Sequence, residues 1–365
     1  MCVQLRRHLV AALLVTAAGA WRASPGVVTP RLPNSAAQHS PCQILQAHMC
    51  ASAAAAEPPA DPMPNLLSDA LRVCGSATAL AWTGCASFAL CTYKPHRIVH
   101  NLIGVSQALT ALPLLWASFS CLSAAVAESR LRSPEGRRLS LALAVASVWS
   151  AITAMWSPAF TSAVVRTVDP VVYPLGLRLA ATTAHLITAG VCVAVWRRAA
   201  TDGQGIVRVA NELACSGLRA LWQLGPPPAA SRRAVQYASC SAAFAVFSGI
   251  ALFQSFPLAT VPSLLGKRLA RAFGAWTVLA AAALQVLKES EGRPNDSAAP
   301  DQAVAPRTAQ CLRRGLRRMS IAHLALMLAV RPLLESVSVY PAAMACLPAV
   351  ACSGLVYALT IAACA

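Results

Sequence analysis

Apolar residues fall in long blocks along this chain, and no other feature of the sequence constrains its fold as strongly. A run of about 20 apolar residues can cross the roughly 30 Å hydrocarbon layer as a helix, because a helix satisfies its own backbone hydrogen bonds. Only 12% of the 365 residues are charged, against about 25% in soluble domains. The sequence therefore predicts an all-α fold, a multi-pass transmembrane helical bundle.

Eight segments have the length and apolar character of membrane spans. They cover residues 73–92, 98–127, 139–165, 172–196, 234–256, 269–287, 319–339 and 341–364. The seventh is the least regular, because Arg331, Pro332 and Glu335 interrupt it. We therefore expect about eight spans.

The net charge of +17 has two explanations, a nucleic-acid partner or the orientation of a membrane protein. Of the 30 basic residues, 18 lie at Arg72 or in the loops 128–138, 197–233 and 288–318, on one side of the expected membrane. Orientation explains this asymmetry, because Lys and Arg concentrate in cytosolic loops. We expect the mature N-terminus and the C-terminus on the cytosolic or stromal side, the lipid bilayer as a partner, and no nucleic acid.

Residues 1–60 have the composition of a targeting leader followed by a disordered extension, and we exclude them from the fold. A basic start and an apolar stretch through Ala20 are typical of a secretory signal peptide. The following residues, through Ala56, contain no acid and are rich in Ala, Ser and Pro, as in a transit peptide. Together they indicate a plastid reached through the secretory pathway; disordered sequence throughout is the simpler alternative. Import into a plastid also reconciles a cleaved signal with the predicted orientation.

An internal repeat divides the rest of the chain. Val172-Tyr173-Pro174 recurs 167 residues later as Val339-Tyr340-Pro341, and a cation and an acid precede each copy. The same offset superposes the first, second and fourth spans on the fifth, sixth and eighth, while the third needs a gap. We expect a first four-span repeat at 65–200 and a second at 234–365, both in one orientation. Residues 201–233 between them predict either an amphipathic surface helix or a linker helix packed on loops.

Residues with catalytic or metal-binding chemistry are sparse. The 14 cysteines include no Cys-x-x-Cys pair, and most lie singly inside expected spans, where a thiol behaves as a small apolar group. His96 and His100 share a helical face, but with Lys94 and Arg97 they fit a membrane-interface cluster better than a metal site, which needs a third ligand. No hydrolase, phosphate-binding or dinucleotide-binding motif occurs. We expect no catalytic residue, no metal and no cofactor, and therefore no enzyme.

Arg331 and Glu335 lie one helical turn apart inside the seventh expected span and can pair along one face. An unpaired charge costs about 2.5–3.5 kcal/mol at the centre of a membrane helix, so such groups pair, face protein or line a pathway. Three interpretations stay open: a structural clasp, a docking point for a partner's helix, and part of a transport path. Gln254 is a further hydrogen-bonding candidate at the end of the fifth span.

The sixth expected span begins with a string of polar and aromatic residues that a generic membrane span does not need, Arg271-Ala272-Phe273-Gly274-Ala275-Trp276-Thr277. Gly274 permits the close approach of another helix. Phe273 and Trp276 share a face at the membrane interface, where aromatic rings anchor helices, and Arg271 can extend to the headgroups. On physical grounds alone, an ordinary aromatic-belt helix start is the simpler explanation.

Together these residues resemble the ergosterol-biosynthesis scaffold family, four-span proteins of the endoplasmic reticulum. The resemblance covers 234–365, and its strong motif corresponds to Ala270–Leu279. Two looser motifs correspond to Gln254-Ser255-Phe256 and to Leu328–Arg331 with Glu335 and Val339-Tyr340. Arg331 stands where the family has histidine, and the spacing from the glutamate to the tyrosine is one residue longer. The family unit is also single rather than doubled.

The resemblance implies a non-catalytic scaffold that tethers the enzymes of sterol carbon-4 demethylation: a methyl oxidase, a dehydrogenase/decarboxylase and a ketoreductase. It implies partner-binding or helix-packing roles for Gln254, Arg271, Phe273, Gly274, Trp276, Thr277, Arg331, Glu335 and Tyr340. It also implies the endoplasmic reticulum membrane, whereas the leader favours the plastid envelope. The alternative function, favoured by the repeat and by Arg331 with Glu335, is a small-molecule or ion transporter of an organelle membrane.

Overall fold

The computed structural model describes residues 63–91, 109–155, 174–199, 232–253, 264–292, 304–336, 352 and 354–365. The chain divides into two units, Met1–Pro64 and Asn65–Ala365, and nearly all the described residues belong to the second. Within the described ranges the only regular structure is helical, which confirms the all-α prediction for this part of the chain. The predicted leader, the helix expected within 201–233, and the pair His96 and His100 lie outside the described residues.

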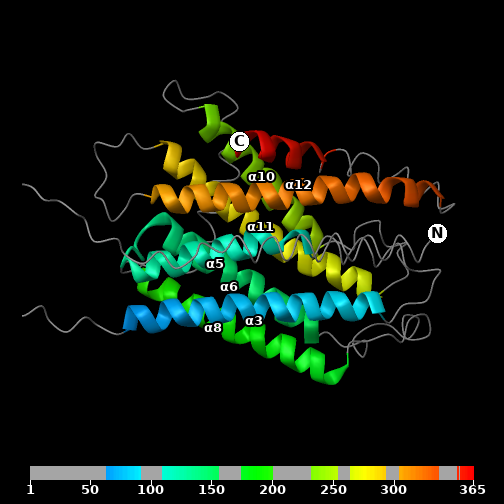
Figure 1. The fold of residues 1–365 in the computed structure, drawn as a ribbon, viewed down its shortest axis with the longest axis horizontal. Helices are drawn as coiled ribbons and strands as arrows, with labels where there is room; N and C mark the ends of the chain where they lie inside the picture. The colour runs from blue at the N-terminus through cyan, green and yellow to red at the C-terminus, as the bar shows by residue number, and fades with distance from the viewer. Residues whose placement is uncertain are drawn as a thin grey trace, which may run out of the picture. The chain divides into compact units, whose positions relative to one another are not determined.

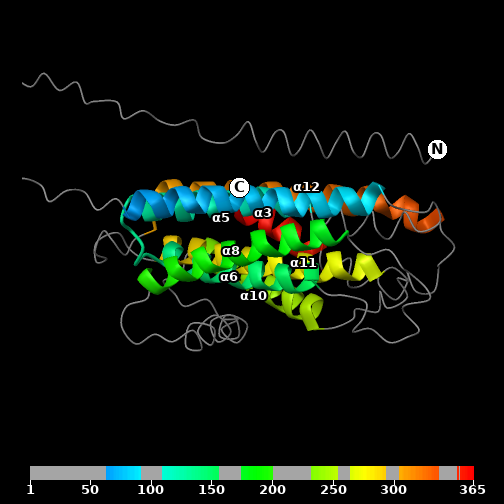
Figure 2. The same ribbon diagram turned by 90° about the horizontal axis from the view of Figure 1, so that it is seen from below.

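The helices run mostly along one common direction, which is horizontal in Figures 1 and 2, and successive helices are antiparallel. They are α3 (Met63–Cys91), α5 (Leu112–Ala127), α6 (Pro134–Met155), α8 (Leu175–Ala199), α10 (Arg232–Phe253), α11 (Leu264–Gly292), α12 (Pro306–Ser336) and a C-terminal helix (Gly354–Ala363). The N-terminal ends of α3 and α12 and the C-terminal ends of α5 and α11 meet at one end of this arrangement, on the left in Figure 1.

Two of the described helices, α6 from Glu135 and α8, are long and apolar enough to cross a membrane. The other expected spans are not confirmed as membrane-length helices. The helix α5 has 16 residues, and the described part of the C-terminal helix is shorter still. The helices α3 and α12 are long, but they begin before their apolar blocks, at Met63 and Pro306 instead of near residues 73 and 319.

Proline explains where several of these helices begin. It occupies the first helical position in α6 and α12 and the second in α3 and α5, where its missing N–H costs no hydrogen bond and its fixed φ suits the helix. In these four helices the prolines therefore mark where the helices start, which the apolar blocks do not.

The helices α5 and α11 form the centre of the bundle. Most side chains of α5 are buried, and on α11 nearly every side chain from Ala275 to Leu287 is buried as well. The helix α11 packs against α10 and α6, α5 packs against α12, and α6 packs against α8. The second and third helices of each half of the chain therefore contact those of the other half.

Several polar side chains inside the bundle are joined in pairs across helix interfaces. A hydroxyl or amide bonded within the bundle avoids the cost of facing lipid or apolar side chains. The bonded pairs are Ser68 with Ser123 (2.8 Å), Thr78 with Thr188 (2.9 Å) and Gln285 with Ser241 (3.0 Å).

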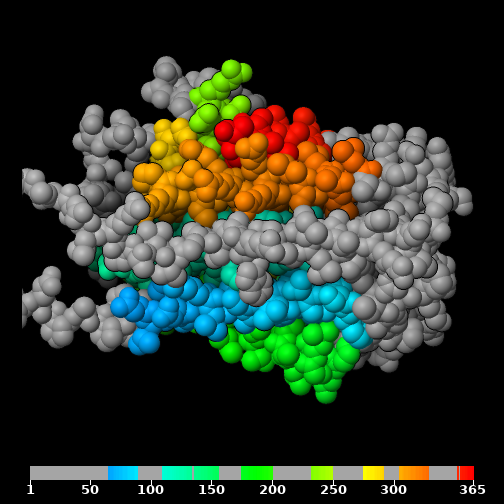
Figure 3. All heavy atoms as spheres, in the orientation of Figure 1, coloured from blue at the N-terminus to red at the C-terminus, as the bar shows by residue number. Residues whose placement is uncertain are grey.

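Large apolar side chains point outward from several of the outer helices. The helices α3, α8, α12 and the C-terminal helix share the face seen in Figure 3. On α3 the exposed residues recur every seven positions, at Leu66, Val73 and Leu80. Other exposed members include Leu186 and Ile187 of α8, Ile321 and Leu328 of α12, and Leu355 and Leu359 of the C-terminal helix.

Gly315 of α12 lies at a close approach to α5. A Cβ placed on Gly315 would be 2.6 Å from Cβ of Ala117 and 3.3 Å from the carbonyl oxygen of Pro113. We expect Gly315→Ala to lower the free energy of unfolding by about 1–3 kcal/mol, because overpacking forces the two helices apart. The matched control is Gly190→Ala on α8, where an added Cβ meets open space. Equal melting temperatures for the two purified variants would contradict the close packing of α5 on α12.

Candidate functional site

The string predicted from sequence lies partly in the core of the bundle. Trp276 and Thr277 are buried, and the ring of Trp276 meets the ring of Trp82 on α3 edge to face, with centroids 5.7 Å apart. The carbonyl oxygen of Gly274 accepts hydrogen bonds from Ser248 of α10 and from Thr277, each 2.7 Å long. This part of the string packs α11 against α3 and α10.

The remaining predicted residues are placed less fully. Arg271 and Phe273 lie in α11, and Arg331 and Glu335 lie in the last two turns of α12, but their side chains are outside the description. Gln254 and Tyr340 lie outside the described residues altogether. The pairing predicted for Arg331 with Glu335 therefore stays a prediction.

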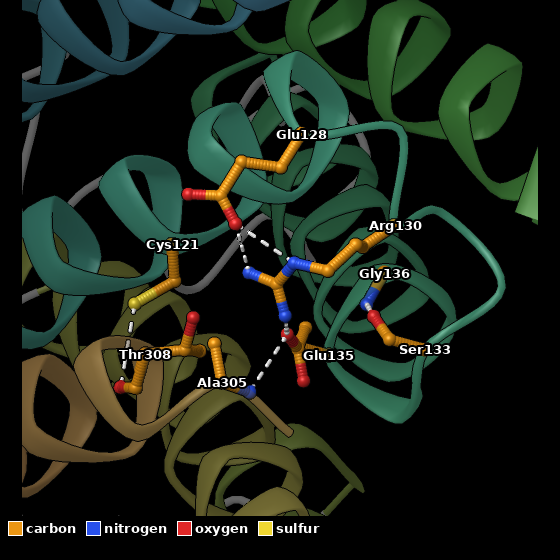
Figure 4. Close-up of polar contacts among 8 residues, drawn as sticks. All are labelled: Cys121, Glu128, Arg130, Ser133, Glu135, Gly136, Ala305 and Thr308. Atoms are coloured by element: carbon orange, nitrogen blue, oxygen red, sulfur yellow. Dashed lines mark hydrogen bonds and ion pairs between the residues drawn. The ribbon is translucent and has the colours of Figure 1, made fainter. Parts of the chain in front are cut away.

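A polar cluster that the sequence reasoning did not identify lies where α5 ends and α6 and α12 begin (Figure 4). We call it the polar junction; it consists of Glu128, Arg130, Glu135 and the backbone N–H of Ala305. The guanidinium of Arg130 bonds Glu128 at 2.6 Å and Glu135 at 2.8 Å. The same oxygen of Glu135 accepts the N–H of Ala305 at 3.5 Å. The junction thus ties the turn after α5 to the starts of α6 and α12.

Local backbone structure explains the position of Glu135. Ser133 caps α6 by accepting the N–H of Gly136 at 3.3 Å, and Pro134 occupies the first helical position. Glu135 then falls in the first turn, where the helix dipole favours a negative charge. Its side chain is fully buried, whereas Arg130 keeps 16% of its side chain exposed. A buried carboxylate needs such a partner, because burying an unpaired charge is costly.

The turn after α5 gives a direct test of this local structure. Ser129 has a φ of 55°. The N–H of Ser129 donates a hydrogen bond to the carbonyl oxygen of Val126, and the N–H of Arg130 donates one to that of Ala125. This hydrogen-bond pattern is common at the C-terminal ends of helices, and the residue in it with a left-handed backbone, here Ser129, is usually glycine. We expect Ser129→Gly to raise the free energy of unfolding by about 1 kcal/mol, and Ser129→Ala to bring no gain. Thermal unfolding of both variants measures this; a larger gain for alanine would contradict the turn.

A second polar network lies at the same end of the bundle. Arg138 of α6 pairs with Glu289 of α11, and Arg313 of α12 pairs with Glu291 of α11. Arg313 also donates to the hydroxyl of Tyr237 at 3.2 Å. That hydroxyl donates in turn to the carbonyl oxygen of Ala363, near the C-terminus, at 2.8 Å. Ion pairs thus bind the basic ends of α6 and α12 to α11.

A single histidine also joins the two halves of the chain in the interior. His323 of α12 is buried, stacks on Tyr357 with a centroid distance of 4.2 Å, and lies 3.3 Å from the hydroxyl of Thr110 through Nδ1. Thr110 precedes α5, and Tyr357 belongs to the C-terminal helix. Among the described residues no group of three or more His, Cys, Asp or Glu side chains is placed to hold a metal ion.

Comparison of the chain with known protein families, with curated proteins and with solved structures found no match. The resemblance of 234–365 to the sterol scaffold family therefore stays a prediction.

Proposed function

We propose that this chain is an integral membrane scaffold, a multi-pass helical bundle that holds partner proteins and performs no chemistry itself. The observation that carries the proposal is the contrast between its interior and its exterior. Inside, the central helices α5 and α11 are packed by apolar and small side chains, with hydroxyl groups bonded to one another across the interfaces. Outside, large apolar side chains recur on outer helices, as on surfaces that face lipid or other membrane helices.

Charge at the ends of the helices supports a membrane position for the bundle. The described Arg and Lys side chains gather mostly at the end where α5 and α11 finish and α12 begins. Arg178 lies at the other end, as do the positions of Lys267, Arg268 and Arg271 in the first turns of α11. Such an asymmetry is expected where one end faces the cytosol or stroma and the other is translocated. The spans other than α6 and α8 are part of this proposal.

The duplication predicted from sequence is part of the same proposal, and two similar side-chain sets support it. In each half, a cysteine of the first helix hydrogen-bonds to a threonine of the fourth, and a second cysteine lies four residues after that threonine. The two sets are Cys74 with Thr188 and Cys192, and Cys240 with Thr360 and Cys364.

The contacts between the halves are also reciprocal. The helix α11 packs on α6, and α5 packs on α12, so the second helix of each half contacts the third helix of the other. The fourth helices correspond with an offset of 172 residues, from Thr188 to Thr360, instead of the 167 residues inferred from the Val-Tyr-Pro sequence. By the same criterion the first helices correspond with an offset of 166 residues, from Cys74 to Cys240, so the second set spans six residues more than the first.

The partners that we propose are the enzymes of sterol carbon-4 demethylation, on the resemblance carried by Gln254-Ser255-Phe256 and Ala270–Leu279. A scaffold raises the effective concentration of each enzyme near the next, so that apolar intermediates pass between active sites within the membrane. In this account Trp276 and Thr277 keep α11 in place, while exposed apolar faces, such as that of Leu66, Val73 and Leu80, meet partner helices.

Purification of the tagged full-length chain from gently solubilised native membranes tests this function. Recovery of the methyl oxidase, the dehydrogenase/decarboxylase and the ketoreductase would support the scaffold and place it in the endoplasmic reticulum. The variant Val73→Asp/Leu80→Asp is expected to lose them, while Val145→Ala serves as the control on another helix. Recovery of plastid-envelope proteins alone, or of the chain by itself, would contradict the proposal.

A small-molecule or ion transporter is the second candidate, and the placement of His323 favours it. This buried imidazole lies between Thr110 and Tyr357, where residues of both halves meet inside the bundle. Polar groups from two related halves often form the central site of a transporter. Solute or proton flux into proteoliposomes that disappears in His323→Leu, with no enzyme recovered by co-purification, would favour this candidate over the scaffold.

A further inference from the structure

Two cysteine thiols face each other where α5 packs on α12. The Sγ atom of Cys121 lies 3.7 Å from the carbonyl oxygen of Thr308, one turn before Cys311. The Sγ atom of Cys311 lies 3.9 Å from the carbonyl oxygen of Ala117, one turn before Cys121. The thiol of Cys121 is also close enough to lower the pKa of the Cys311 thiol. Each sulfur therefore lies against the helix turn that leads to the other.

The packing of the neighbouring turn keeps these helices close. Gly315 of α12 lies opposite Ala117 of α5. The next residues on the same two faces are Cys311, four residues before Gly315, and Cys121, four residues after Ala117. Residues four apart lie on one face of a helix, so antiparallel helices in contact at the first pair are also in contact at the second. A disulfide needs Cα atoms about 4.4–6.8 Å apart, a separation that helices reach where small residues line their contact.

The surroundings of Cys311 favour its reactive form. Cys311 is partly exposed and precedes the apolar block that starts at Met319, whereas Cys121 is buried. The adjacent thiol of Cys121, and to a lesser extent the guanidinium groups of Arg314 and Arg318, outweigh the effect of burial and lower the pKa of the Cys311 thiol to about 7. The thiolate is the nucleophile in thiol–disulfide exchange, so Cys311 is the sulfur that reacts first.

We propose that Cys121 and Cys311 form a redox modification site, which reacts with low-molecular-weight disulfides such as oxidised glutathione to close a reversible disulfide between α5 and α12. The Cys311 thiolate attacks one sulfur of oxidised glutathione, forms a mixed disulfide and releases one glutathione thiolate. Cys121 gives its proton to that thiolate and attacks the Cys311 sulfur. The second glutathione leaves as a thiolate that takes up a proton from solvent. The protein thiols lose two electrons, and oxidised glutathione is reduced to two molecules of glutathione.

This bond would join the first half of the chain to the second across 190 residues of sequence. It lies at the interface that also carries the polar junction, where Glu135 accepts the N–H of Ala305 at the start of α12. Oxidation would therefore fix the position of α12 on α5 covalently. In the reduced protein, side-chain packing and the polar junction alone would hold the two helices together. The inference does not depend on the proposed scaffold function.

The test uses the full-length chain in detergent, with a protease site inserted between residues 294 and 303. Samples are equilibrated in mixtures of reduced and oxidised glutathione, quenched with N-ethylmaleimide, cleaved, and run on a gel without reductant. We expect the two fragments to stay joined in the oxidising mixtures and to separate after dithiothreitol. Cys121→Ser and Cys311→Ser are each expected to abolish the joined species.

Cys240→Ser is the matched control, because Cys240 and Cys364 also lie close together on opposite sides of the cleavage site. The joined species should persist in this variant. Peptide mapping of the unaltered protein must show the Cys121–Cys311 linkage, which keeps the test independent of how the variants fold. Separation of the fragments at every glutathione ratio, or a joined species that depends on Cys240, would overturn the proposal.

Discussion

Trp276→Ala is expected to lower the free energy of unfolding by about 3–5 kcal/mol, among the largest effects of any single substitution in this chain. Trp276 lies at the centre of the bundle, where 2% of its surface is exposed and its ring meets Trp82 edge to face. Its loss leaves a cavity between α3 and α11 that the surrounding helices can fill only in part. Chemical or thermal unfolding of the purified protein measures the change.

Trp276→Phe is the matched control for this prediction. Phenylalanine keeps an aromatic ring against Trp82, and the indole Nε1 of Trp276 has no hydrogen-bond partner among the described residues, so no bond is lost. We expect a cost of about 1.5 kcal/mol or less. If alanine were tolerated as well as phenylalanine, Trp276 would not hold α11 against α3.

Arg130→Met is expected to destabilise the protein by about 3–5 kcal/mol, because it leaves the buried carboxylate of Glu135 without its ion-pair partner. Glu135 is fully buried, and Arg130 is its partner in the polar junction. The double variant Arg130→Met/Glu135→Leu is expected to be more stable than Arg130→Met, because it removes the unpaired charge together with its partner. Thermal unfolding of the single and double variants gives the comparison.

The control for this comparison is Asp69→Asn, since the pair of Arg72 with Asp69 is exposed on both sides. Arg72 itself is kept, because its Nε also donates to the hydroxyl of Ser123 at 3.2 Å. Exposed ion pairs contribute little to stability, about 0–1 kcal/mol. Equal effects of Asp69→Asn and Arg130→Met would show that the polar junction is as exposed to solvent as the surface pair. That result would contradict its role in joining α5, α6 and α12.

The class of the fold was predictable from sequence, because block length and low charge content are properties of the whole chain. Helix limits were not, because apolar blocks show burial or lipid contact and do not show where a helix starts. The helix α12 starts before its apolar block and includes the basic segment Arg307–Arg318. The charged groups of these arginines can stay in water while the aliphatic parts of their side chains lie along the helix surface. Pro306, at the first helical position, was the available signal for that start.

Sequence reasoning predicted a helix-packing or partner-binding role for Arg271–Thr277, of which the structure places Trp276 and Thr277 in the core. It missed the polar junction and the thiol pair. The charges of 128–138 were interpreted as orientation signals, although Ser133-Pro134-Glu135 is a recognisable helix start that places a carboxylate in the first turn. Cys121 and Cys311 are 190 residues apart, and no local spacing relates them. Their proximity arises from the contact of α5 with α12, which only the folded chain reveals.

Protease protection of tagged loops in sealed vesicles shows whether this bundle crosses a membrane. Short epitope tags are inserted beside Arg132, in the turn between α5 and α6, and in separate molecules between residues 156 and 173, and sealed membrane vesicles are then treated with protease. We expect the protein to stay in the membrane pellet after alkaline extraction. We also expect protease to cleave the tag beside Arg132 from the cytosolic or stromal side, while the tag between residues 156 and 173 is protected. Release of the protein by alkali, or cleavage of both tags in intact vesicles, would contradict the membrane position of the bundle.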